Sequence, residues 1–277
     1  MKIRVAKSAG FCFGVKRAID LALKTASGRN NVYMLGDIVH NEDVVRLIQK
    51  AGIKKIRALT SGKNRLLLMR AHGAGQKVFR HALALGYKIL DATCPMVKEI
   101  HRIAKDMEAK DYRIIIVGDK NHEEVQGIVG QLKQGPIVIP DKGRLPLTAV
   151  KKTKKACVVV QSTQNLQKSL YIFKTLKKYI PDLRFYNTIC RPTRLKQKEI
   201  RRMPKENDVM IIIGSKESAN TRRLYEISKS LNEKSHWINA AKDIKKEWFR
   251  GADSVGVSAG ASTPDITIQK VIAYLKR

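Results

Sequence analysis

An internal repeat constrains the fold of this 277-residue chain more than any other feature of its sequence. Three cysteines each open a segment of helical pattern, and each is followed 24 residues later by a glycine that ends an apolar run (36−12, 118−94 and 214−190). The three pairs are Cys12 and Gly36, Cys94 and Gly118, and Cys190 and Gly214. Three equal spacings in matching local context indicate a chain built from repeated units.

Each unit has the rhythm of a parallel α/β structure, in which strand, loop, helix and second strand alternate. The first apolar strands end at residues 36, 118 and 214, and the second strands cover 66–72, 157–162 and 255–262. We therefore predict an α/β fold of three pseudo-threefold-related lobes with small parallel sheets. The predicted lobes are residues 1–93, 94–188 and 189–277.

Polar side chains follow the strands of all three units. They lie four or more residues beyond the first strands or at the ends of the second strands: His40, His72, His122, Ser162, Ser218, Asn220 and Ser262. Ligands of parallel sheets gather at the carboxyl ends of the strands, where imidazoles, hydroxyls and backbone N–H groups suit phosphate oxygens. No nucleotide-binding glycine motif accompanies them, so a small phosphorylated or diphosphate ligand is expected.

The repeated cysteines differ from the fourth one in their position. Cys12, Cys94 and Cys190 precede helices, where the positive helix end favours the thiolate that metals need. Cys157 begins an apolar strand and is expected to be a buried hydrophobic side chain. Three thiolates leave one position open, on zinc or on a four-iron cluster, and the spacing alone does not choose between them.

Two other sets of titratable residues receive no role from spacing alone. Glu124 lies two residues after His122, and its position favours a solvated glutamate at a helix start. His81, His101 and His236 lie in helical or variable stretches.

The charge of the chain leaves a second function open. Lys and Arg number 55 against 24 Asp and Glu, a formal net charge of +31. The alternative is therefore a basic nucleic-acid-binding protein with a structural three-cysteine metal site. The cations are spread along the chain and only 6% of residues are aromatic, so no specific nucleic acid is expected.

No apolar run approaches the roughly 20 residues of a membrane span, and no signal core precedes the first strand, so a cytoplasmic location is expected.

The motifs of this chain resemble those of the 4-hydroxy-3-methylbut-2-enyl diphosphate reductase family, the last enzymes of the methylerythritol phosphate route to isoprenoids. The matching segments span nearly the whole chain and include GFCFGVKRAI, GDIVHNEDVV, RAHGAG, DATCPMV, NHEEVQG, VVQST, GSKESAN and VGVSAGASTPD.

The resemblance implies a role for each repeated residue. Cys12, Cys94 and Cys190 would hold a 4Fe-4S cluster with one open iron at the centre of the three lobes. The seven polar residues after the strands would bind the diphosphate and the substrate hydroxyl. Glu124 would be the proton donor, which reverses the interpretation from spacing. The implied reaction is a two-electron reductive dehydroxylation, with the substrate oxygen on the open iron, that yields isopentenyl and dimethylallyl diphosphate. A ferredoxin or flavodoxin would supply the electrons.

Several positions depart from the family pattern. Ser162 replaces a threonine and keeps the hydroxyl, whereas Ala219 replaces a second substrate-binding serine and loses a donor. Glu123 replaces a proline and adds negative charge beside the expected diphosphate site. The segment after Cys190, RPTRLKQKEI, is more basic than is usual in the family.

Overall fold

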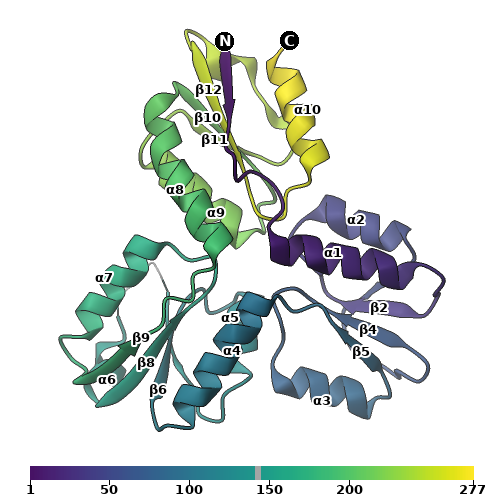
Figure 1. Cartoon of the computed structure of the whole chain (residues 1–277), viewed down its shortest axis with the longest axis vertical. Coiled ribbons are helices and arrows are strands. Elements are labelled where there is room, and N and C mark those ends of the chain that lie inside the picture. The colour runs from purple at the N-terminus through teal and green to yellow at the C-terminus, as the bar shows by residue number, and fades with distance from the viewer. Residues whose placement is uncertain (141–144) are drawn as a thin grey trace. The chain divides into compact units, whose positions relative to one another are not determined.

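The computed structural model describes residues 1–140 and 145–277, and it contains three four-stranded sheets (Figure 1). All strand pairs in these sheets are parallel. The prediction of an α/β fold with small parallel sheets is therefore confirmed. By its internal contacts the chain divides into two compact units. Unit 1 comprises Met1–Lys16, Val39–Ile48 and Arg191–Arg277, and unit 2 comprises Arg17–Ile38 and Gln49–Cys190.

Unit 2 contains two of the three sheets. The first sheet has the order β3-β2-β4-β5, formed by β2 (Val32–Leu35), β3 (Lys54–Ile56), β4 (Leu66–Met69) and β5 (Lys88–Asp91). The second has the order β7-β6-β8-β9, formed by β6 (Arg113–Val117), β7 (Ile137–Ile139), β8 (Lys155–Val160) and β9 (Asp182–Phe185). The helices of this unit are α3 (Gln76–Ala84), α4 (Pro95–Glu108), α5 (Glu123–Val129), α6 (Leu147–Lys151) and α7 (Leu166–Leu176). The helix α1 (Phe13–Ala26) begins in unit 1 and continues into unit 2 at Arg17.

The strands of the second sheet are apolar on both faces because helices cover both. Ile115, Val117 and Val158 pack with residues of α6 and α7. Their strand neighbours Ile114 and Cys157 pack on the opposite side with residues of α4 and α5. Continuous runs of β-branched residues are what a parallel sheet buried on both faces requires. Cys157 is fully buried, as the sequence predicted.

Unit 1 is built around the third sheet, whose order is β1-β12-β10-β11. Its strands are β1 (Lys2–Val5), β10 (Val209–Ile213), β11 (Ser235–Ile238) and β12 (Ser254–Ala259). One face packs on α10 (Asp265–Leu275), and the other packs on α8 (Arg191–Glu206) and α9 (Ala219–Lys229). The unit also contains α2 (Glu42–Lys50) and the short 3-10 helices Ala241–Asp243 and Lys246–Phe249.

The first strand occupies a place that the sequence did not predict. With one exception, the strands of each sheet come from a single predicted lobe, 1–93, 94–188 or 189–277. The exception is β1, which lies in the first predicted lobe but pairs with β12 of the third, from Lys2 with Ser254 to Val5 with Val257. In each sheet the strand just before a repeated cysteine is an edge strand: β5 before Cys94, β9 before Cys190 and β1 before Cys12. The repeat is thus cyclic, and its third sheet takes its last strand from the start of the chain. The three-lobe division itself stays a prediction.

Candidate functional site

The three repeated cysteines stand immediately before helices, as predicted. Cys94 is the N-cap residue of α4 with Pro95 at its first position, while α1 and α8 begin one residue after Cys12 and Cys190. All three side chains are partly exposed and none is in a disulfide. Burial raises the pKa of the Cys157 thiol to about 12, so this fourth cysteine stays protonated and unreactive.

A backbone hydrogen bond ties each of these cysteines to the second strand of the preceding repeat. The Cys94 N–H donates to the Ala71 carbonyl at 2.9 Å, the Cys190 N–H to Ser162 at 3.1 Å, and the Cys12 N–H to Ala261 at 3.1 Å. Each acceptor is at, or one residue before, a predicted polar residue: His72, Ser162 or Ser262. The thiol of one repeat is therefore fixed next to the polar strand end of another. Sequence reasoning missed these links, which join residues far apart in the chain.

Glu124 is buried, so the interpretation from spacing alone, a solvated glutamate, is wrong. Its side chain is 1% exposed, and both carboxylate oxygens contact Ser162. The Ser162 N–H donates to Oε1 at 2.6 Å, and the Ser162 hydroxyl donates to Oε2 at 2.8 Å. Desolvation raises the pKa of Glu124, against the opposing effect of the Ser162 hydrogen bonds and the nearby His72. Burial of a carboxyl disfavours its charged form relative to its protonated form.

Two imidazoles of unit 2, those of His72 and His122, meet at the N-terminus of α5. His122 is its N-cap residue, and its Nδ1 accepts the Glu124 N–H at 3.1 Å. In the neutral ring, the hydrogen is therefore on Nε2, which becomes a donor. The rings of His72 and His122 meet edge to face with centroids 5.5 Å apart.

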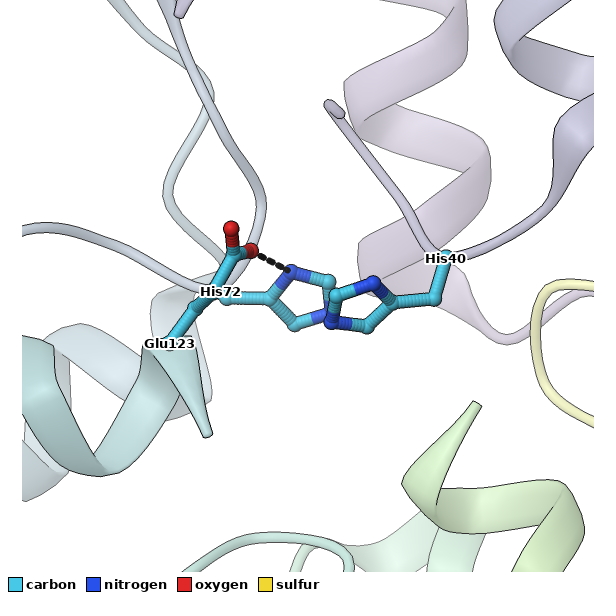
Figure 2. Close-up of side chains that lie close together, drawn as sticks. All are labelled: His40, His72 and Glu123. Carbon is cyan, nitrogen blue, oxygen red and sulfur yellow. Dashed lines mark ion pairs between the residues drawn. The ribbon is translucent and has the colours of Figure 1, made fainter. Parts of the chain in front are cut away.

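Glu123 points toward His72, as Figure 2 shows. Its Oε2 lies 3.5 Å from His72 Nδ1, and its Oε1 forms an ion pair with Arg70. The negative charge expected at this position is present, but Arg70 balances it. The sequence did not predict a role for Arg70, because no pattern distinguishes an arginine that pairs with a site residue from any other arginine at a strand end. Figure 2 also draws His40, which belongs to unit 1.

Two polar residues of unit 1, Ser218 and Ser262, form hydrogen bonds within the unit. Ser218 is the N-cap residue of α9, and its Oγ accepts the Thr221 N–H at 3.3 Å. The Ser262 hydroxyl donates to the His40 carbonyl at 3.0 Å. Asn220 is 4% exposed, and its Nδ2 has no hydrogen-bond partner within residues 1–140 and 145–277. A buried donor without a partner is costly, so this amide is suited to a bound acceptor.

Two positioning residues of α8 were not predicted. Lys196 is 2% exposed, and its ammonium donates to the carbonyls of Ser8, Gly10 and Ala259. The Glu199 carboxylate accepts the N–H groups of Lys7 and Ser8 at 3.0 and 2.9 Å. Together they fix the loop before Cys12. Within a run of basic residues, a buried lysine has no signal that separates it from a solvated one.

His101 is a second buried residue to which the sequence assigned no role. It lies on α4, is 9% exposed, and packs against Gly73, next to His72, and Gly127 of α5. A Cβ on Gly73 would lie 2.9 Å from the His101 ring, and the φ of Gly73 is +76°, so glycine is required there. Burial and then Lys105 lower the pKa of His101 to about 4, which makes it neutral at pH 7. The ring also lines a cavity of about 270 Å³ with Asp91 and Gln131.

These features define a class: an α/β protein of three parallel sheets, with a cysteine before a helix in each repeat and polar side chains at the strand ends. A family model described as "LytB protein" matches residues 3–276. A 4-hydroxy-3-methylbut-2-enyl diphosphate reductase of Geobacter metallireducens is 36% identical, over 100% of this chain and 97% of its own length. The same-named protein of Aquifex aeolicus is 38% identical, over 97% and 94%.

Solved structures agree with the family match. The structure of (E)-4-hydroxy-3-methyl-but-2-enyl diphosphate reductase, the terminal enzyme of the non-mevalonate pathway, has a TM-score of 0.73 at 36% identity, covering 100% of this chain and 99% of that one. The E-1-hydroxy-2-methyl-but-2-enyl-4-diphosphate reductase from Plasmodium falciparum has a TM-score of 0.91 at 25% identity, covering 100% and 88%. This chain belongs to the LytB family. Across residues 1–140 and 145–277, none of the helices has the length and apolar character needed to traverse a bilayer.

Proposed function

We propose that this chain is a 4-hydroxy-3-methylbut-2-enyl diphosphate reductase that removes the allylic hydroxyl of its substrate. Two electrons and two protons convert the C–OH bond into a C–H bond and water, giving isopentenyl or dimethylallyl diphosphate. Full-length relatives with this name and the family match support the proposal. The relatives give no support to the alternative, a nucleic-acid-binding protein with a structural metal.

The observation that carries the proposal is the buried Glu124 carboxyl with its two contacts to Ser162. Burial raises the pKa of this carboxyl and so favours its protonated form, which can act as the acid that turns the departing hydroxyl into water. The Ser162 N–H and hydroxyl then stabilise the carboxylate that remains after the proton is lost. The electrostatic interaction of His72 with Glu124 also favours this carboxylate.

Cys12, Cys94 and Cys190 would hold a 4Fe-4S cluster through their thiolates. The chemistry of the donor set fits, since three partly exposed cysteines that form no disulfide precede helices, and a fourth is buried and protonated. When bound, such a cluster supplies the electrons and an open iron for the substrate hydroxyl. A ferredoxin- or flavodoxin-type protein is the proposed electron donor.

The substrate is a small molecule whose diphosphate we assign to the polar strand ends. His122 is assigned to this set as the N-cap residue of α5, whose Nδ1 accepts the Glu124 N–H. Asn220 offers a buried N–H without a partner in the described part of the chain. His40, His72, Ser218 and Ser262 would complete the set, with Ser162 beside the acid.

Anaerobic purification tests the proposal directly. We expect a brown protein with about four iron and four sulfide per chain, which reduces the diphosphate substrate with a viologen dye as reductant. Glu124→Gln should keep the iron and lose turnover by about 10²–10⁴-fold, because general acids contribute that much. The matched control is Glu99→Gln, an exposed glutamate of α4 paired with Arg102, which should leave turnover unchanged. Zinc in place of iron, or full turnover in Glu124→Gln, would contradict this assignment.

A further inference from the structure

The exposed face of α8 carries an unusual row of positive charges. Exposed cations recur at intervals of three or four residues: Arg191, Arg194, Lys198, Arg202 and Lys205. With 1.5 Å of rise per residue, this cationic stripe extends about 21 Å along one side of the helix. Leu195 interrupts it with an apolar side chain that is 48% exposed.

The opposite face of the same helix is firmly anchored in unit 1. Ile200 and Met203 are buried against the sheet, and Lys196 and Glu199 hold the loop before Cys12. The one acidic residue in the middle of α8 is therefore directed at backbone N–H groups and away from the stripe. The stripe is presented on a fixed helix and not on a mobile segment.

The stripe is poorly neutralised by the chain itself. Among the described residues, Arg202 is the one member with an ion pair, to Glu206 at 3.3 Å, and the other four lie beyond 4.0 Å of any carboxylate. On α4, by contrast, Arg102 bonds both Glu99 and Asp106, and Lys98 pairs with Asp91. The charge of α8 is thus left available to a partner.

The position of two of these charges opposes helix stability. Arg191 and Arg194 lie in the first turn of α8, which contains no acidic residue. Cations near a helix N-terminus are disfavoured by the helix dipole, by roughly 0.3–1 kcal/mol each. Their presence there indicates a use other than stabilising the helix.

We propose that the cationic stripe of α8 is the docking surface for an acidic electron-carrier protein. This inference rests on the proposed function, because Arg191 is bonded directly to Cys190, one of the proposed cluster ligands. A partner that covers the N-terminal half of the stripe would bring its own redox group to the ligand side of the helix. Opposite charges would steer the encounter, and Leu195 would supply an apolar contact at its centre.

Nucleic acid is the competing partner for any basic surface. The stripe favours a protein because it contains no aromatic side chain on which bases could stack. It is also confined to one helix face instead of following a groove.

The test compares two triple variants that each remove three charges. Arg194→Gln/Lys198→Gln/Lys205→Gln changes the stripe, and Lys174→Gln/Lys177→Gln/Lys178→Gln changes exposed lysines at the end of α7. Turnover is measured with reduced flavodoxin at low and moderate ionic strength, and separately with a viologen of zero net charge. Iron content and circular dichroism establish that both variants are folded.

We expect the stripe variant to lose about tenfold in kcat/KM for flavodoxin at low salt, and less at moderate salt, because steering is screened. The α7 variant should change by less than twofold, and viologen turnover should be unchanged in both. Equal losses in the two variants would overturn the proposal, since net charge and not the stripe would then decide the rate. A stripe variant with normal flavodoxin turnover but weakened binding to generic RNA would overturn it in favour of nucleic acid.

Two further outcomes separate this inference from the proposed function. Wild-type protein that fails to turn over with the viologen would refute the reductase itself. If the triple variant does not fold, Lys198→Gln alone carries the test, with an expected loss of about twofold for flavodoxin and none for the viologen.

Discussion

Acid should destabilise this protein through His101. The folded chain lowers the pKa of this imidazole from 6.5 to about 4, first through burial and then through the charge of Lys105, with Asp91 opposing and Lys98 adding to the effect. As the pH falls below 6.5 the unfolded chain binds a proton at this position, but the folded chain does not until about pH 4. Stability is therefore lost across the window from pH 6.5 down to 4.

The magnitude follows from the size of the shift. A difference of 6.5 − 4 = 2.5 pH units corresponds to about 3.5 kcal/mol, at about 1.4 kcal/mol per unit. At pH 5, roughly 2 kcal/mol of this should already be lost. For a protein whose total stability is of order 5–15 kcal/mol, such a loss is readily measured.

The assay is urea unfolding of the reduced, iron-free chain between pH 7 and 4.5, for the wild type and His101→Gln. The free energy of unfolding of the wild type minus that of the variant should fall by about 2 kcal/mol between pH 7 and 5, because glutamine binds no proton. Leu83→Gln, at an exposed position of α3, is the control and should show a pH-independent difference, because neither side chain titrates. The reasoning would be refuted if the difference in unfolding free energy between the wild type and His101→Gln did not change with pH. An NMR titration that places the pKa of His101 near 6.5 would refute it as well.

Three further outcomes follow from the burial of individual side chains. Alkylation of the iron-free protein should modify three of its four cysteines and spare Cys157, as checked by mass spectrometry of peptides. Cys157→Ala should bind as much iron as the wild type, whereas Cys94→Ser should lose iron. Lys196→Met should lower the free energy of unfolding by about 2–5 kcal/mol, because three carbonyls lose their donor; an unchanged urea midpoint would show that water replaces it.

The repeat was predictable from sequence because its signals are local. A cysteine before a helix, an apolar run and a glycine lie within 24 residues of one another, so Cys12, Cys94 and Cys190 could be recognised as equivalent. The polar residues at the strand ends followed from the same periodicity. Cys157 could be excluded because a strand of buried residues surrounds it.

The remaining features depend on contacts that no local pattern records. The position of Glu124 two residues after a histidine favoured a solvated side chain, and burial beside Ser162 reverses this. Lys196 lies in a basic run, and its neutralisation by backbone carbonyls is visible only in the folded helix. His101 was passed over because the glycines that make room for its ring come from two other segments.

The pairing of β1 with β12 has a consequence for biosynthesis. Lys2 emerges from the ribosome 252 residues before its partner Ser254 (254−2). Unit 2 ends at Cys190, so its residues are complete while β10, β11 and β12, the other strands of the third sheet, have yet to be translated. The N-terminal strand must therefore wait without its neighbour, exposing a strand edge throughout elongation. The charges of Lys2 and Arg4 on this short strand are the kind that protect a waiting edge from pairing with another nascent chain.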